Sequence, residues 1–267
     1  MAMPSQTIAD TVGRCRARRA FLVATVLAAL GLVPAGAAEV TRLGVASAMG
    51  DVLTVVVHRP EVGSRVDQNL YQTAANADPA FDDAARQVAI DAARRALPAA
   101  AAVQPVDLAG TSSDLARGWT AGGRFAPPAA LKDQWQQAGL SHLLLITRWR
   151  GATALKTLNT RVGSGHLEGL GFYVDKHQKM RRHDTGETGE GFLAPFAYLQ
   201  LQLINLATGE VEKTEQVTST STLSAARNRT GTDAWAALDP AQKVRVLQQL
   251  IRSGVGQAVP RLLGTGG

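Results

Sequence analysis

Three histidines and two acidic residues lie close together in the chain and could supply metal ligands. His166 stands near Glu168, and His177 and His183 follow, with Asp184 directly after the last histidine. A zinc site needs two or three nitrogen ligands held at about 2 Å in a fixed geometry. The spacing here is irregular and the segment is rich in glycine, so we expect solvated loop histidines and no metal site.

The glycine-rich stretch 163–169 resembles a dinucleotide-binding loop only superficially. Its third glycine comes one place late for G-x-G-x-x-G, no clear strand precedes it, and no helix follows. The sequence also contains no nucleophile elbow, phosphate-binding loop or H-E-x-x-H motif. We therefore predict a glycine turn between short strands, no catalytic residue and no cofactor.

Two functional hypotheses remain open at this point. The first is a non-catalytic protein that binds another protein or an envelope polymer through its loops and an open sheet edge. The second is a periplasmic hydrolase or metal-dependent enzyme, because catalytic groups often meet from distant segments. The enzyme would use the residues His166, Glu168, His177, His183 and Asp184. We favour the first, and expect that the protein is not an enzyme.

A basic block follows the glycine-rich stretch. Its charged residues are Lys176, Lys179, Arg181 and Arg182, and an acidic block comes directly after it. The basic block could meet lipid phosphates or an acidic protein surface. An exposed hairpin tip, whose charges keep it soluble, is the interpretation we favour.

The amino terminus has the three parts of a secretory signal peptide. Arginines lie between residues 14 and 19, an apolar run covers 21–33, and a small-x-small site ends the segment. The cleavage site consists of Ala35, Ala37 and Ala38, with the cut after Ala37. The apolar run is shorter than the about 20 residues that a membrane-spanning helix needs.

Removal of this leader changes the charge and the cysteine content. The whole chain has 267 residues and a formal net charge of +6, but the leader contains four arginines and one aspartate. The remaining chain keeps a net charge of only +3, which argues against nucleic-acid binding. Cys15, the single cysteine, precedes the apolar run and is lost with the leader. We therefore expect a periplasmic protein that is not a lipoprotein and has no transmembrane segment.

The pattern of the first half predicts strands and one long helix. We expect a strand pair over 43–46 and 52–58 with a turn at 49–51, the second strand being buried on both faces. A helix begins at Asp78-Pro79 and ends at Pro98, with apolar residues on one face. An edge strand over 102–106 precedes a loop over 110–128.

The second half predicts a helix with Leu131 and Trp135 on one side, which Gly139 ends, and a buried strand over 142–147. A hairpin follows, with an alternating strand around 199–203 and a polar edge strand over 211–222. The last helix opens with a capping box at Asp239 and is limited by Pro260.

This order of elements resembles a group of periplasmic envelope-assembly domains. The matching pieces are "AGLSH" at 138–142, entering an apolar strand, and "INLATGE" at 204–210, at a hairpin. The group includes the curli-secretion (CsgG-like) family, the amino-terminal domain of TolB and the lipoprotein activators of penicillin-binding proteins. The resemblance implies their fold and carries over no functional residue. This chain departs from it by lacking a lipid-bearing cysteine and the membrane hairpins of the curli channel.

Together these patterns predict an α/β fold. We expect a signal peptide over 1–37 and a single layered domain over 38–267, in which helices flank a mixed sheet. A glycine-rich, charged insertion occupies about 150–195. The oligomeric state is left open.

The leader gives the first testable prediction. Amino-terminal sequencing of the exported protein should begin at Ala38, because signal peptidase cuts after a small-x-small site. A mature protein that still begins at Met1 or Met3 would contradict this prediction.

Overall fold

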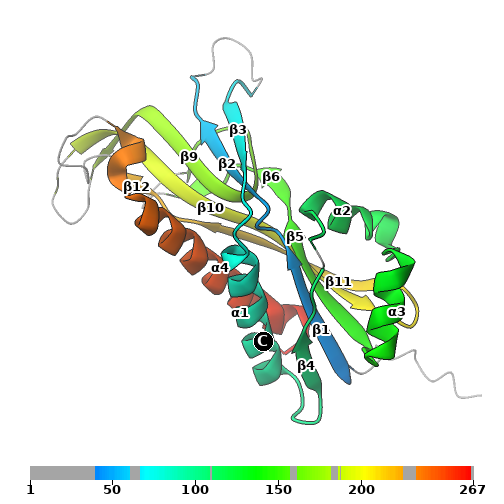
Figure 1. Cartoon of the computed structure of the whole chain (residues 1–267). Coiled ribbons are helices and arrows are strands. Elements are labelled where there is room, and N and C mark those ends of the chain that lie inside the picture. The colour runs from blue at the N-terminus through cyan, green and yellow to red at the C-terminus, as the bar shows by residue number, and fades with distance from the viewer. Residues whose placement is uncertain are drawn as a thin grey trace, which may run out of the picture. The chain divides into compact units, whose positions relative to one another are not determined.

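A computed structural model describes residues 40–60, 67–108, 110–156, 161–181, 186, 188–224 and 233–265. Within these residues ten strands form one mixed sheet with helices on both faces, which confirms the predicted α/β class (Figure 1). The strands of this sheet are β1 (Arg42–Ala48), β2 (Val52–Val57), β3 (Leu70–Ala75), β4 (Ala102–Pro105), β5 (His142–Arg148), β6 (Arg150–Ala152), β9 (His166–Arg181), β10 (Thr188–Asn205), β11 (Glu210–Thr220) and β12 (Leu223–Ser224). A separate pair consists of β7 (Leu155–Lys156) and β8 (Arg161–Val162). The helices are α1 (Ala80–Ala96), α2 (Ser113–Gly118), α3 (Ala129–Gln137) and α4 (Pro240–Leu262), with short 3-10 turns η1 (Ala121–Gly123) and η3 (Ala234–Ala237).

The long strand β10 runs through the middle of the sheet. Along one side it pairs first with β9 and then with β5, and the change falls between Tyr198 and Leu199. Along its other side it pairs with β11 and β12. The strands β9 and β5 therefore lie end to end beside one continuous strand.

The same interruption occurs one strand further out. β1 pairs in parallel with β5, and β2 pairs in parallel with β9. The predicted hairpin between the first two strands is therefore wrong. Residues 49–51 carry the chain from one half of the sheet to the other and form no hairpin turn. The backbone N–H groups of Met49 and Gly50 instead donate hydrogen bonds to the side chain of Asp82.

Burial differs between these two strands. β1 is buried from Leu43 to its end, whereas in β2 only Thr54 and Val56 are buried and the rest are half-buried. The expectation that 52–57 is buried on both faces is wrong, because β2 lies next to the exposed strand β3. β4 forms the opposite end of the strand order, as the proline at its end predicts.

Helices α1 and α4 cover one face of the sheet (Figure 1). The predicted faces are confirmed for most positions, since Phe81 and Ala85 of α1 and Ile251 and Val255 of α4 are buried in the same core. Asp239 and Gln242 form the predicted capping box. The helix continues past Pro260 by two residues, to Leu262.

The other face has two separate covers. At one end α2 and α3 bury Trp119 and Trp135 against β1, β5 and β10. At the other end the β6–β8 region covers Phe192, Phe196 and Tyr198 of β10. The predicted loop over 110–128 thus contains α2, and the predicted insertion over 150–195 supplies β6 to β9 and the start of β10.

Two glycines of α4 provide a matched test of how closely this helix packs. A Cβ atom on Gly254 would lie 2.4 Å from Val217 Cγ1 and 2.6 Å from Ser219 Oγ on β11. A Cβ atom on Gly256 would lie 3.6 Å from Val88, an ordinary contact. We expect Gly254→Ala to lower the free energy of unfolding by about 1–3 kcal/mol. Gly256→Ala should raise it by about 0.5–1 kcal/mol through helix propensity. Urea unfolding of both variants checks this, and equal effects would contradict the close packing.

Candidate functional site

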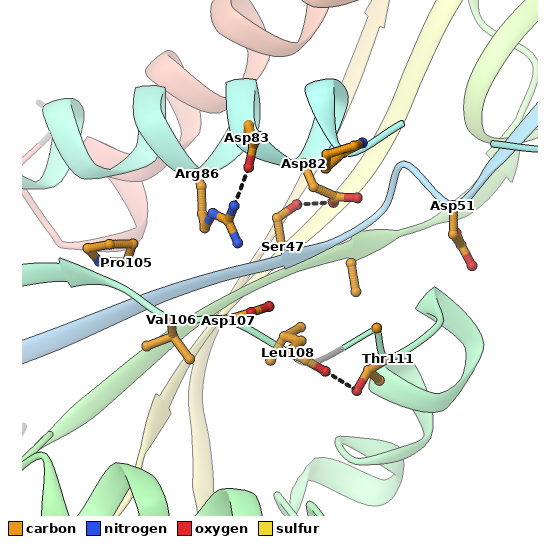
Figure 2. Close-up of a pocket in the computed structure, with 13 residues that line it drawn as sticks. Ser47, Asp51, Asp82, Asp83, Arg86, Pro105, Val106, Asp107, Leu108 and Thr111 are labelled. Atoms are coloured by element: carbon orange, nitrogen blue, oxygen red, sulfur yellow. Dashed lines mark hydrogen bonds and ion pairs between the residues drawn. The ribbon is translucent and has the colours of Figure 1, made fainter. Parts of the chain in front are cut away.

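A cleft of about 560 Å³ opens where β1 and β4 end and α1 begins (Figure 2). Its lining comes from the end of β1, the first turns of α1 and the segment after β4. The lining residues are Ser47, Ala48, Asp51, Pro79, Asp82, Asp83, Arg86, Pro105, Val106, Asp107, Leu108, Gly110 and Thr111.

The sheet topology explains this position. β1 and β4 are parallel neighbours, so their carboxyl ends lie at the same edge of the sheet. The chain leaves β1 toward β2 and leaves β4 toward α2, and the two segments diverge. Ligands of open α/β sheets bind where chain segments diverge in this way at the carboxyl ends of parallel strands.

Asp82 holds one wall of the cleft in place. Its Oδ1 accepts a hydrogen bond from Ser47 Oγ at 2.6 Å (Figure 2). The same Oδ1 accepts from the backbone N–H of Met49 at 2.8 Å, and Oδ2 accepts from Gly50 N–H at 3.2 Å. Asp82 lies in the first turn of α1, where a negative charge is favoured by the helix dipole. Gly50 leaves room for this contact, because a Cβ atom there would lie 2.9 Å from Asp82 Oδ2.

The cleft combines carboxylates with an apolar wall. Asp51, Asp82, Asp83 and Asp107 contribute negative charge, and Arg86 contributes one positive charge. The arginine is already paired with Asp83 (Figure 2). The facing wall contains Val106 and Leu108, both buried, together with Pro105. The carboxylates of such a lining can accept hydrogen bonds from a positively charged group, and its apolar side chains can contact an apolar group.

An ion-pair network behind the cleft fixes α2 to the sheet. Asp51 Oδ2 accepts a hydrogen bond from Ser113 N–H at 3.1 Å, and its Oδ1 lies 3.8 Å from Arg148 Nε. The side chain of Arg148, only 9% exposed, also contacts Asp114 at 3.0 Å. Because a buried charge that loses its partner is costly, this network constrains the loop that carries Asp51.

The described residues of the enzymatic alternative each contact a different partner. Glu168 forms an ion pair with Arg117 at 2.8 Å, and the backbone N–H groups of His166 and His177 bond to Tyr71 and to Asp175. His183 and Asp184 lie outside the described residues. Within the described part of the chain, no group of three or more histidine, cysteine or acidic residues is arranged to hold a metal ion.

A polar cluster around His58 was missed by the sequence analysis. The Nδ1 atom of His58 lies 2.9 Å from the hydroxyl of Tyr173, 3.2 Å from Asn69 Oδ1 and 3.5 Å from Ser164 Oγ. Its Nε2 lies 3.8 Å from Asp175 Oδ2, and burial raises the pKa of Tyr173. These residues come from the end of β2, the start of β3, the segment before β9 and β9 itself, so no sequence spacing indicates them. Their mutual contacts make the cluster a joint between these strands.

The basic block lies on the hairpin of β9 and β10. Lys176 and Lys179 are exposed, Arg181 is the last residue of β9, and Arg182 lies outside the described residues. Binding of an anionic partner to this block stays a prediction.

The amino-terminal predictions concern residues that the structure does not describe. Ala35, Ala37 and Ala38 lie outside the described ranges, so cleavage and export also stay predictions. None of the described helices is long and apolar enough to span a membrane.

Comparison with known proteins finds only solved structures of low similarity. No protein-family model and no curated protein matches the chain. A protein from Xanthomonas campestris is 14% identical over 85% of this chain and 86% of that one, with a TM-score of 0.40. A putative neuraminyllactose-binding hemagglutinin homolog from Helicobacter pylori is 9% identical over 80% and 81%, with a TM-score of 0.37. The PelC dodecamer from Paraburkholderia phytofirmans is 12% identical over 87% and 90%, with a TM-score of 0.30.

These identities and TM-scores are too low to transfer a function to this chain. The resemblance to the CsgG-like, TolB and activator domains likewise stays a prediction. The site therefore has to be judged on its own geometry.

Asp82 and its neighbour Asp83 provide a matched test of the cleft wall. Asp82→Ala removes the acceptor of two backbone N–H groups and one hydroxyl, and should lower the free energy of unfolding by about 1–3 kcal/mol. Asp83→Ala removes a largely exposed ion pair, and should cost at most about 1 kcal/mol. Equal losses in urea unfolding would show that Asp82 does not hold the wall.

Proposed function

We propose that the chain is an exported, non-catalytic binding protein of the cell envelope. Its cleft takes part of a protein or of an envelope polymer. The observation that carries this proposal is the cleft itself, whose one wall is fixed by Asp82 and whose other wall is apolar.

The size and lining of the cleft support binding of a compact chemical group. Ligand sites of proteins have volumes of roughly 300–1,000 Å³ and combine apolar lining with a few placed polar groups. The cleft, at about 560 Å³, has both kinds of lining. The carboxylates Asp51 and Asp82 are held by backbone N–H groups of the surrounding segments, so the cleft is formed before a partner arrives.

The charge of the lining favours a partner group that is positively charged. Four aspartates and one arginine line the cleft, and Arg148 behind it lies 3.8 Å from Asp51, so the lining keeps an excess of negative charge. A partner that presents an amine or guanidinium group together with an apolar part would match both walls.

Export and envelope localisation rest on the leader sequence. The basic region, the apolar run and the small-x-small site support transport across the inner membrane. The sheet and its helices come entirely from residues beyond the predicted cleavage site.

Charge reversal at the rim of the cleft tests the proposal. Tagged protein covering residues 38–267 is used to capture partners from a periplasmic and envelope extract, with quantitative mass spectrometry and glycan analysis as the measurement. Asp107→Lys reverses an exposed charge of the lining. We expect it to reduce recovery of the specific partner about tenfold or more, because like charges then face each other.

The matched control is Asp133→Lys, which reverses an exposed charge on α3 outside the cleft. It should leave recovery unchanged, and equal losses with both variants would remove the cleft from the proposal. The metal content of purified wild-type protein tests the enzymatic alternative. Stoichiometric zinc or manganese would overturn the non-catalytic proposal in favour of a metal-dependent enzyme.

A further inference from the structure

The edge strand β3 leaves its outer side without a partner among the described residues. It pairs in the sheet with β2 alone, and all six residues from Leu70 to Ala75 are exposed (Figure 1). An exposed strand edge presents a row of backbone donors and acceptors that another extended strand can bind.

The register identifies which backbone groups point outward. The N–H group of Asn76 donates to the carbonyl of Asp51 at 2.8 Å, in register with the β2–β3 pairs. Hydrogen-bonded pairs alternate along an antiparallel ladder, so Gln72 and Ala74 also face β2. The N–H and C=O groups of Tyr71, Thr73 and Ala75 therefore point away from the sheet.

This edge lacks the features that keep exposed edges from pairing. The sequence of β3 is LYQTAA, which contains no charged residue and no proline, and its pairing with β2 runs without a register shift. The other long edge strand, β11, carries Glu212, Lys213 and Glu215, and its register with β10 shifts. Natural sheets protect their edges with charges and bulges. By this criterion β11 is protected and β3 is open to another strand.

The side chains of β3 are complementary to those of a second, antiparallel copy of the same strand. The large residues Leu70 and Tyr71 stand at one end, and the small residues Ala74 and Ala75 stand at the other. If Thr73 lies on a twofold axis, Tyr71 of one copy comes opposite Ala75 of the other, and Gln72 comes opposite Ala74. All three outward-facing residues then pair, and the long side chains of Tyr71 and Gln72 each meet an alanine, while Leu70 comes opposite Asn76.

We propose that two copies of this protein associate through antiparallel pairing of β3, with Thr73 next to the twofold axis. The sheet then continues from one copy into the other. The absence of charge on β3 means that no like charges face each other within the paired strands. This interface lies apart from the cleft and does not depend on ligand binding there.

The paired strands give a weak dimer. One strand edge buries much less than the about 1,600 Å² of a standard stable interface. We expect a dissociation constant of roughly 10 µM to 1 mM for protein covering residues 38–267, measured by sedimentation equilibrium.

Substitutions at the axis test the pairing directly. Thr73→Lys and Thr73→Glu each place like charges opposite each other, and each should weaken the dimer about tenfold or more. An equimolar mixture of the two variants should restore association, because opposite charges then meet. Thr214→Lys, at an exposed position of β11, is the control and should leave the dimer unchanged.

A cross-link gives a second readout that does not require the charge variants. Protein covering residues 38–267 contains no cysteine, so Thr73→Cys introduces the only thiol. Residues opposite each other in an antiparallel pair have Cβ atoms about 5 Å apart, so a short bis-maleimide should join two Thr73→Cys chains. Thr214→Cys should remain monomeric. A wild-type protein that stays monomeric at millimolar concentration, or a variant mixture that fails to associate, overturns the proposal.

Discussion

Buried backbone groups at the interruption between β1 and β2 need hydrogen-bond partners, and side chains supply them. A buried N–H group without an acceptor is costly, and the turn at 49–51 lies in the middle of the sheet. Asp82 accepts from two of these groups, and Asn76 donates to the carbonyl of Gly50 at 2.7 Å. Asp51 in turn accepts from the N–H of Ser113. Residues 49–51 are thus hydrogen-bonded to α1, to α2 and to the residue that follows β3.

The cleft is a consequence of this interruption. Because β1 ends in the middle of the sheet, its carboxyl end opens between α1 and the segment after β4. The carboxylates that satisfy the interrupted backbone are among those that line the cleft, so under the proposed function the same groups serve stability and binding. A substitution of Asp82 would change both, whereas Asp107 lies at an exposed position of the lining.

Local sequence patterns predicted those elements whose stability is decided locally. The capping box at Asp239 and the proline and aspartate before α1 depend on neighbouring residues, and both are confirmed. The strand expected around 199–203 is part of β10, but its alternation is wrong, because Gln202 is buried and Gln200 is half-buried. Tertiary pairing decided the rest. Residues 49–51 have the composition of a hairpin turn, but β1 and β2 do not pair with each other, and their inner partners β5 and β9 lie about a hundred residues further along the chain. The glycines of β9 suggested a loop, yet this strand is held between β2 and β10, where Gly171 allows close approach to the backbone of Thr54.

The candidate site was harder to predict than the fold. Nothing in the neighbouring sequence singles out Asp82, and Asp51 belongs to a stretch that predicts only a turn. Neither residue belongs to a motif, because their partners come from strands and helices far away in the sequence. The histidine-rich segment was a candidate metal site through residue type alone. In the structure its described residues contact different partners.

The central position of β10 also bears on biosynthesis. This strand covers residues 188–205, and both halves of the sheet depend on it. During translation β1 emerges long before β5, and the ladder that joins them to β9 forms only after most of the chain has left the ribosome. Sheets built from such distant pairings fold slowly, because the entropy of closing a long loop is lost before the stabilising contacts form. The sheet can therefore be completed only after β10 has emerged, and until then β5 and β9 lack the strand that they share.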